Sequence, residues 1–249
     1  MNISFEIVPR SLEAFEQQYT FVQTLDKGIN IINVPDIQRF DTRSWELATR
    51  IDRRKYRFIP HFRAIDFKID SGELYRIIED YELDNVLFVT GDPPEGLKRA
   101  YYNTDVVDLI RVVRQRFPQL NIYAGFDPHR QGLQDECDYT QRKADAGATG
   151  FFSQPFYDYR LIEIYAEHME GLETYIGISP ITTMASKHYW EVKNKVKFPK
   201  SFQPDYDWNV EFANQVIASA AANGWNVYFM PIRIDLNKYF ERIQLLSSA

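Results

Sequence analysis

The sequence contains a single cysteine, Cys137, in 249 residues. One cysteine cannot form an internal disulfide, and it cannot supply the several thiolates of a cysteine-based metal site. No apolar run approaches the roughly 20 residues that a membrane-spanning helix needs. The N-terminus also lacks the basic flank and apolar segment of a signal peptide. We therefore expect a cytoplasmic protein that does not enter a membrane.

Positive charge is scarcer than negative charge. The chain carries 29 Lys and Arg against 35 Asp and Glu, which gives a formal net charge of −6. Nucleic-acid-binding proteins usually gather Lys and Arg on one face. The one basic cluster, residues 50–57, is interrupted by Asp52 and lies at an expected helix end, where cations suit the helix dipole. We expect no nucleic-acid partner.

What the sequence does have is an alternation of short apolar runs with segments of helical period. This pattern is typical of parallel strands joined by right-handed crossovers, and eight units close into a (β/α)8 TIM barrel. An open doubly wound sheet is the alternative, but no Gly-x-Gly-x-x-Gly follows the first strand. We expect one α/β catalytic domain over residues 1–249, without a regulatory extension. The predicted strands are 3–8, 29–34, 58–61, 85–90, 121–125, 149–154, 174–178 and 225–230; the predicted helices lie near 11–25, 43–53, 71–81, 104–116, 133–146, 158–169, 185–195, 209–223 and 236–245.

Polar residues gather where the predicted strands end. In such a barrel the C-terminal ends of the strands face one mouth, which carries the active site. We therefore expect a polar rim there, made of Glu6, Asn33, Asp36, His61, Thr90, Asp92, Asp127, His129, Gln154, Ser179 and Arg233, with Phe126 beside them.

Glu6 lies inside an apolar strand in which Ser4 and Glu6 share one face. If that face is the barrel interior, burial raises the pKa of the carboxyl, which could then hold a proton near neutral pH and act as a general acid. The alternative is a structural ion pair with an interior arginine.

Two further polar residues are candidates for binding a flat heterocycle. Asp92 follows Gly91 and precedes two prolines that stiffen its loop, although an Asp in such a loop can also simply cap a turn. Gln154 offers an amide that both donates and accepts, as the edge of a pterin or flavin requires, or it is an ordinary loop amide.

Other site chemistries find little support. His61 and His129 come from separate segments without metal-ligand spacing, so we expect no metal site. No Gly-x-Ser-x-Gly elbow is present, which disfavours a Ser-His-Asp hydrolase.

Six segments, in order and in register, resemble the methylenetetrahydrofolate reductase family. Ser-Phe-Glu-Ile-Val-Pro at 4–9 is similar to its Ser-Phe-Glu-Phe-Phe-Pro, and Val-Thr-Gly-Asp-Pro-Pro at 89–94 to its Leu-Arg-Gly-Asp-Pro-Pro. The other four segments are Pro-His at 60–61, Lys-Ala-Asp-Ala-Gly-Ala at 143–148, Ser-Gln-Pro-Phe-Tyr-Asp at 153–158 and Gly-Ile-Ser-Pro-Ile at 177–181.

The resemblance implies a barrel that holds FAD at its mouth, takes hydride from NAD(P)H and reduces 5,10-methylenetetrahydrofolate to 5-methyltetrahydrofolate. Glu6 would be the general acid, Asp92 would lie near flavin and pterin, and Gln154 would bind the pterin edge. Phe156 and Arg233 are further expected substrate contacts. We also expect a homo-oligomer.

The positions that match the family's flavin contacts are His61, Thr90, Asp92, Tyr102, Asn103, Phe126, His129, Glu136 and Lys143. Thr90, Phe126 and Glu136 depart from the family's usual Arg, Tyr and Asp. Loss of that Arg removes a charge-assisted donor. Two alternatives to the flavin enzyme therefore stay open: a reductase that takes hydride directly from the nicotinamide, and a non-redox folate-binding barrel that acts with a partner subunit.

Overall fold

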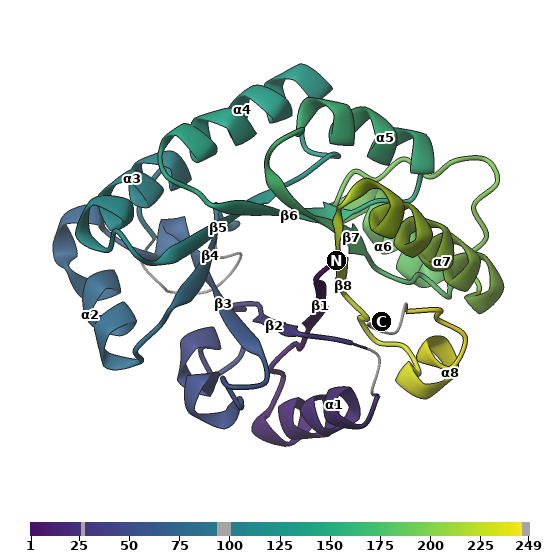
Figure 1. The fold of residues 1–249 in the computed structure, drawn as a ribbon, viewed down its shortest axis with the longest axis horizontal. Coiled ribbons are helices and arrows are strands. Elements are labelled where there is room, and N and C mark those ends of the chain that lie inside the picture. Colours follow the sequence, from purple (N-terminus) through teal and green to yellow (C-terminus); the bar gives the residue numbers. More distant parts are fainter. Residues whose placement is uncertain (26–27, 94–100, 246–249) are drawn as a thin grey trace.

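The computed structural model describes residues 1–25, 28–93 and 101–245. Eight strands form a closed barrel in sequence order, and all eight neighbouring pairs are parallel (Figure 1). The predicted α/β barrel and its eight strands are thereby confirmed. The strands are β1 (Ile3–Glu6), β2 (Ile31–Val34), β3 (Arg57–Arg63), β4 (Asn85–Val89), β5 (Asn121–Phe126), β6 (Gly150–Pro155), β7 (Glu173–Ile178) and β8 (Asn226–Phe229).

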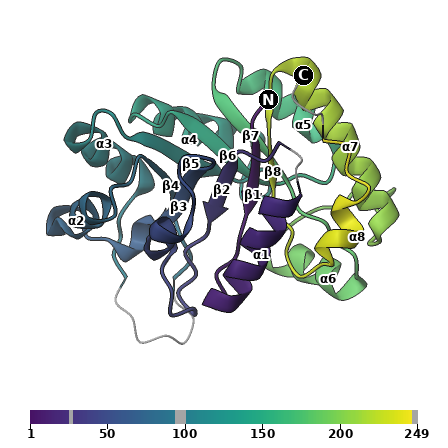
Figure 2. The ribbon, with the colours of Figure 1, turned by 60° about the horizontal axis from the view of Figure 1, so that its bottom comes forward.

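Helices form an outer ring around these strands (Figures 1 and 2). The first begins where its sequence predicts, because the Ser11 hydroxyl accepts a hydrogen bond from the Ala14 N–H at 3.1 Å. No helix in the described part of the chain combines the length and apolarity needed to cross a membrane. The helices are α1 (Leu12–Thr24), α2 (Glu73–Asp80), α3 (Val106–Arg116), α4 (Leu133–Asp145), α5 (Tyr159–His168), α6 (Met184–Lys193), α7 (Tyr206–Asn223) and α8 (Leu236–Phe240).

The segment after β2 differs from the prediction. In place of an α-helix near 43–53, a 3₁₀ segment, η1 (Ser44–Arg50), follows the strand; η2 (Ala64–Asp66) and η3 (Ile69–Ser71) are shorter 3₁₀ turns after β3. Trp45 stacks on Phe62 with ring centroids 4.9 Å apart, and the Ser44 hydroxyl donates to the His61 carbonyl at 2.6 Å. These contacts hold the segment against β3 and override its local helical pattern.

The larger core lies between the strands and the helices. Residues on the strands alternate between the two faces of the barrel wall, and the outward ones are large and buried. Phe5, Phe88, Phe151 and Phe229 each have no exposed side-chain surface and pack in this outer layer.

A second, smaller core fills the inside of the barrel. Its centre is Phe152, which stacks on Tyr175 at 4.1 Å with the rings 8° apart. Tyr123 and Tyr228 meet Phe152 edge-on at 5.3 and 5.1 Å. Ile31, Ile59, Leu87 and Met230 complete this set, which we call the aromatic layer.

The N-terminal end of the barrel is closed by polar contacts below the aromatic layer. Arg57 donates to the Tyr123 hydroxyl at 2.9 Å, and the Tyr175 hydroxyl donates to Glu173 at 2.7 Å. Arg57 and Glu173 approach to 3.7 Å. The tyrosine hydroxyls therefore find partners although their rings are buried.

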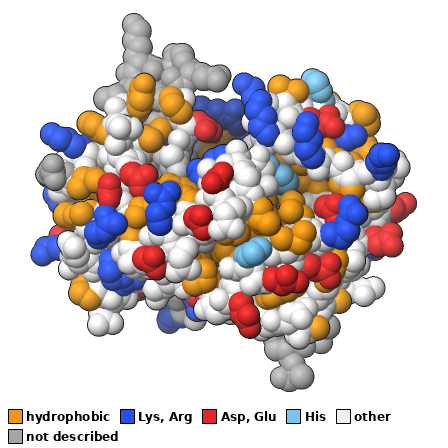
Figure 3. Space-filling view, turned by 90° about the horizontal axis from the view of Figure 1, so that it is seen from above, with side chains coloured by type: hydrophobic (Ala, Val, Ile, Leu, Met, Phe, Trp, Pro, Cys, Tyr) orange, Lys and Arg blue, Asp and Glu red, His pale blue; other side chains and the backbone are white. Residues whose placement is uncertain are grey.

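Basic and acidic side chains are interspersed on the surface seen in Figure 3, within the part that the structure describes. A face built in this way offers a polyanion no broad basic patch.

Removal of the central ring should destabilise the barrel. Phe152→Ala leaves a cavity among three aromatic neighbours, so we expect the free energy of unfolding to fall by about 3–5 kcal/mol. Urea denaturation followed by circular dichroism measures it. Val192→Ala, at a half-exposed position on α6, is the control and should change stability by less than about 1 kcal/mol. Equal effects of the two substitutions would contradict the proposed role of the layer.

Candidate active site

Glu6 ends β1 with its carboxyl inside the barrel, 9% exposed. It accepts a short hydrogen bond from the Tyr228 hydroxyl of the neighbouring strand β8. Among the described residues Glu6 forms no ion pair. The structure therefore does not contain the alternative, a structural pair of Glu6 with an interior arginine.

Burial dominates the chemistry of this carboxyl. It raises the pKa of Glu6 from 4.5 to about 7, although the hydrogen bond from Tyr228 opposes the rise. A group with this pKa is partly protonated near neutral pH, which suits a general acid.

Asn33 on β2 lies beside Glu6 and connects two more interior groups. Its amide N–H donates to the Ser4 hydroxyl, and its carbonyl oxygen lies 2.9 Å from His61 Nε2. Burial lowers the pKa of His61 to about 3, so the imidazole is neutral and donates through Nε2. A neutral, hydrogen-bonded polar set thus surrounds one ionisable acid.

The turn after β4 requires a glycine at position 91. Gly91 has φ +83°, and a Cβ there would lie 2.7 Å from Arg63 Nε. Arg63 also donates to the backbone carbonyl of Asp92. The Asp92 side chain is exposed. Within the described residues it neither pairs with a cation nor caps a backbone N–H. Pro94, the second of the two prolines, lies outside the described residues.

Two arginines at the same end of the barrel are neutralised. Arg43 binds Asp36 and lies 3.5 Å from Asp66, and Arg63 lies 3.8 Å from Asp66. Asp36, expected on the polar rim, is thus engaged in this network, and burial raises its pKa to about 6 against the effect of Arg43.

The expected substrate residues divide into two groups. Gln154 on β6 and Arg233 after β8 are exposed, as is Asp92. Phe156 is fully buried and packs 5.7 Å from Tyr165 of α5, in the outer core. Phe126, expected near the flavin, lies beside it with 2% exposure. Both rings pack in the outer core and not at the mouth: Phe126 occupies an outward position of β5, and Phe156 follows β6 after a register shift between Phe152 and Pro155.

The expected flavin positions divide in the same way. Thr90, Tyr102 and Asn103 are exposed, and His129 is half-buried, with its Nε2 donating to the Pro155 carbonyl at 2.8 Å.

Glu136 and Lys143 are, in contrast, buried and satisfied by the protein. Glu136 is 0% exposed and accepts the Asp127 N–H at 2.9 Å. Lys143 is 2% exposed and donates to the Gly125 carbonyl at 2.7 Å; burial, opposed by Glu136, lowers its pKa to about 8. These two side chains brace α4 against β5.

Tyr228 was not predicted from the sequence, although it is the direct partner of Glu6. Its signal is the alternation Asn226, Tyr228, Met230, which places two residues of β8 and the residue after it on the interior face. No group of three or more His, Cys, Asp or Glu in the described ranges could hold a metal ion.

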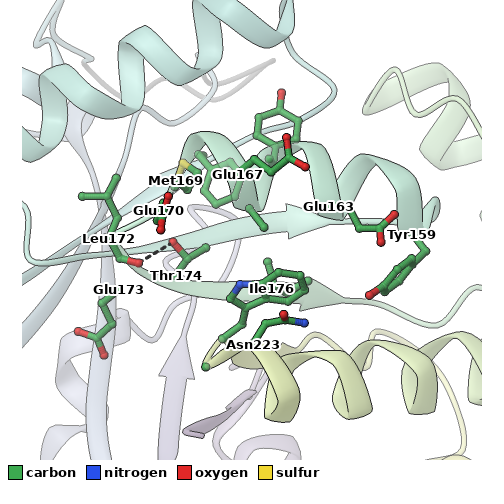
Figure 4. A pocket seen from close by; sticks show the side chains of 16 residues that line it. Tyr159, Glu163, Glu167, Met169, Glu170, Leu172, Glu173, Thr174, Ile176 and Asn223 are labelled. Atoms are coloured by element: carbon green, nitrogen blue, oxygen red, sulfur yellow. Dashed lines mark hydrogen bonds between the residues drawn. The ribbon is translucent and has the colours of Figure 1, made fainter.

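A cavity of about 650 Å³ lies away from the mouth, outside the barrel between α5, β7 and α7 (Figure 4). Met169 and Ile176 lie in its apolar wall, and four glutamates line it: Glu163, Glu167, Glu170 and Glu173. These carboxylates make it a poor site for an anionic ligand.

The fold is a (β/α)8 barrel with a buried acid at the C-terminal end of β1, the end at which barrels of this class carry their active sites, and sequence comparison identifies the family. The methylenetetrahydrofolate reductase family model matches residues 2–223. The chain therefore belongs to the methylenetetrahydrofolate reductase family, a family of oxidoreductases.

Curated relatives agree at low identity. The chain is 25% identical over 217 residues to the 5,10-methylenetetrahydrofolate reductase of Escherichia coli (strain K12), covering 80% of this chain and 71% of the relative. It is 23% identical over 223 residues to that of Pectobacterium carotovorum subsp. carotovorum, covering 83% and 73%. Among solved structures, 2,3-dimethylmalate lyase superposes with a TM-score of 0.57 at 10% identity over 94% of this chain and 75% of that one, a likeness of fold alone.

The raised pKa of Glu6 makes stability depend on pH. Between about 4.5 and 7 the folded state holds more protons than the unfolded state, so this group's contribution falls as pH rises. Glu6→Gln should therefore be more stable relative to wild type at about pH 8 than at about pH 4, by on the order of 3 kcal/mol. Chemical denaturation at both pH values measures this difference. Glu170→Gln, at an exposed position, is the control; a difference for Glu6→Gln that does not vary with pH would contradict the assignment.

Proposed function

We propose that this chain reduces 5,10-methylenetetrahydrofolate to 5-methyltetrahydrofolate with NAD(P)H, through bound FAD. The observation that carries the proposal is Glu6, a buried carboxyl with a pKa of about 7 at the mouth of a barrel of this family. The curated relatives of this chain are named for the same substrate.

Glu6 would supply the proton that opens the substrate's five-membered ring. Protonation of N10 lets the bond between N10 and the methylene carbon break, and its electron pair stays on N10. The iminium left at N5 then accepts a hydride at carbon, which gives the methyl group. Tyr228 would hold the carboxyl in place, and the aromatic layer beneath excludes water from it.

Three exposed groups would position the substrate. Gln154 can donate to and accept from the pterin edge, Asp92 can accept from its N–H groups, and Arg233 can bind a carboxylate. Phe156 could take part only through its backbone in this arrangement, since its ring is covered.

The accessible residues of the expected flavin site carry hydroxyl, amide and imidazole groups that can hydrogen-bond a flat polar ring or a hydroxylated chain. Thr90, Tyr102, Asn103 and His129 would hold FAD along β4 and β5. When bound, FAD would carry hydride from NAD(P)H to the folate. His61, Glu136 and Lys143 would instead support the site from inside the protein.

That internal engagement favours a second candidate. Glu136 accepts a hydrogen bond from the Asp127 N–H and Lys143 donates one to the Gly125 carbonyl, so both are engaged by backbone groups, and Thr90 supplies no charge. A reductase that acts on the same folate and takes hydride directly from the nicotinamide would need none of these three residues to bind a flavin.

An absorption spectrum distinguishes the two candidates. If FAD is the carrier, protein incubated with FAD and desalted should keep flavin bands, and NAD(P)H should bleach them. Protein that stays colourless but oxidises NAD(P)H when methylenetetrahydrofolate is added would support direct transfer. A colourless protein without such activity would contradict both.

Glu6→Gln should separate catalysis from binding. Without the proton donor, we expect turnover to fall by about 10²–10⁴-fold while folate affinity changes little. Steady-state kinetics and calorimetric titration with folate measure the two quantities. Glu170→Gln serves as the charge-matched control, and unchanged turnover in Glu6→Gln would remove this residue from the mechanism.

A further inference from the structure

Three arginines extend from neighbouring loops at the mouth. Arg233 follows β8, Arg10 follows β1 and Arg39 follows β2, and β1 pairs with both other strands. All three are exposed. We call them the arginine cluster.

The cluster differs from the other mouth arginines in its lack of acidic partners. Arg43 and Arg63 are neutralised by Asp36 and Asp66. Across residues 1–25, 28–93 and 101–245, no member of the arginine cluster forms an ion pair or a side-chain hydrogen bond. Unlike Arg43 and Arg63, the three arginines thus present positive charge at the mouth without a carboxylate within ion-pair distance among the described residues.

The three charges also act on one another. The pKa of Arg10 is lowered by partial burial and by the nearby charges of Arg233 and Arg39. Such repulsion destabilises the protein until an anion offsets it. Arg233 additionally has a left-handed backbone with φ 55°, which residues other than glycine seldom adopt.

We propose that Arg10, Arg39 and Arg233 form a binding site for a multiply charged anion, with carboxylate or phosphate groups, on the β8–β1–β2 side of the mouth. Guanidinium groups bind both kinds of anion with paired hydrogen bonds. Glu6 and Tyr228 lie on β1 and β8, below the same loops. A ligand anchored by its charged end would therefore have its remainder near the proton donor.

The proposal that the arginine cluster binds an anion does not rest on the proposed function. The identity of that anion does rest on it. A folate offers the carboxylates of its glutamate chain, and NAD(P)H or FAD offers phosphates. The shared chemistry is several negative charges on one flexible end.

Inorganic tripolyphosphate tests the site without any reductase activity. We expect calorimetric titration to show binding that weakens as salt increases. Arg10→Gln and Arg39→Gln should each weaken it by about tenfold. The control is Arg54→Gln, whose side chain is 96% exposed and lies outside the cluster.

Thermal unfolding shows whether each variant is folded, and Arg10→Lys and Arg39→Lys should retain part of the affinity because they keep the charge. The proposal fails if wild type binds no tripolyphosphate. It also fails if Arg54→Gln weakens binding as much as the cluster variants, since attraction would then be general.

Substrate kinetics assign the anion. If Arg10→Gln and Arg39→Gln raise the KM of a triglutamate folate but not of the monoglutamate, the cluster binds the glutamate chain. If they raise the KM of NADPH alone, it binds nucleotide phosphate. Unchanged KM values for both substrates would overturn a role in substrate binding, whereas an inactive wild type would refute the proposed function and leave the tripolyphosphate result standing.

Discussion

The structure depends on the filling of the barrel interior by aromatic rings. A closed barrel of eight strands leaves a space that side chains must fill, and here Tyr123, Phe152, Tyr175 and Tyr228 fill it in mutual contact. Three of these rings carry a hydroxyl, and each must find a partner because it is buried. Tyr123 and Tyr175 find theirs at the N-terminal end, while Tyr228 finds Glu6 at the mouth. The aromatic layer thus separates the polar contacts of Tyr123 and Tyr175 at the N-terminal end from the Glu6–Tyr228 pair at the mouth.

The separation determines what Glu6 can do. A carboxyl on an open surface would remain ionised near neutral pH, whereas one above an apolar layer resists ionisation. His61 responds to the same surroundings in the opposite sense and stays neutral. Glu6 is consequently the group in this interior set whose charge changes near pH 7, and the fold places there one titrating carboxyl instead of a set of interacting acids.

The sequence predicted the eight strands because parallel strands that are covered on both faces read as short apolar runs, and these runs alternate with segments of helical period. It also predicted the interior position of Glu6, since alternation within a single strand requires no knowledge of the rest of the fold. Tyr228 could not be found in this way, because it lies 222 residues from its partner and only closure of the barrel joins them. The helix expected near 43–53 is present as a shorter 3₁₀ helix, Ser44–Arg50, which contacts such as that of Trp45 with Phe62 hold against β3. Phe126 points outward because of its place in β5, and Phe156 because the register of β6 shifts between Phe152 and Pro155; motif matching supplies neither.

The four glutamates around the cavity between α5 and α7 have a consequence for association rates (Figure 4). Together with the net charge of −6, they make much of this protein repel an approaching anion. At the mouth, Arg10, Arg39 and Arg233 have no carboxylate partners among the described residues, so an anion approaching that side meets less repulsion. Such an arrangement guides diffusing ligands before any contact forms, and salt weakens the guidance. The four glutamates of the cavity thereby influence the rate at which an anionic ligand associates with the mouth of the barrel, although they lie far from it.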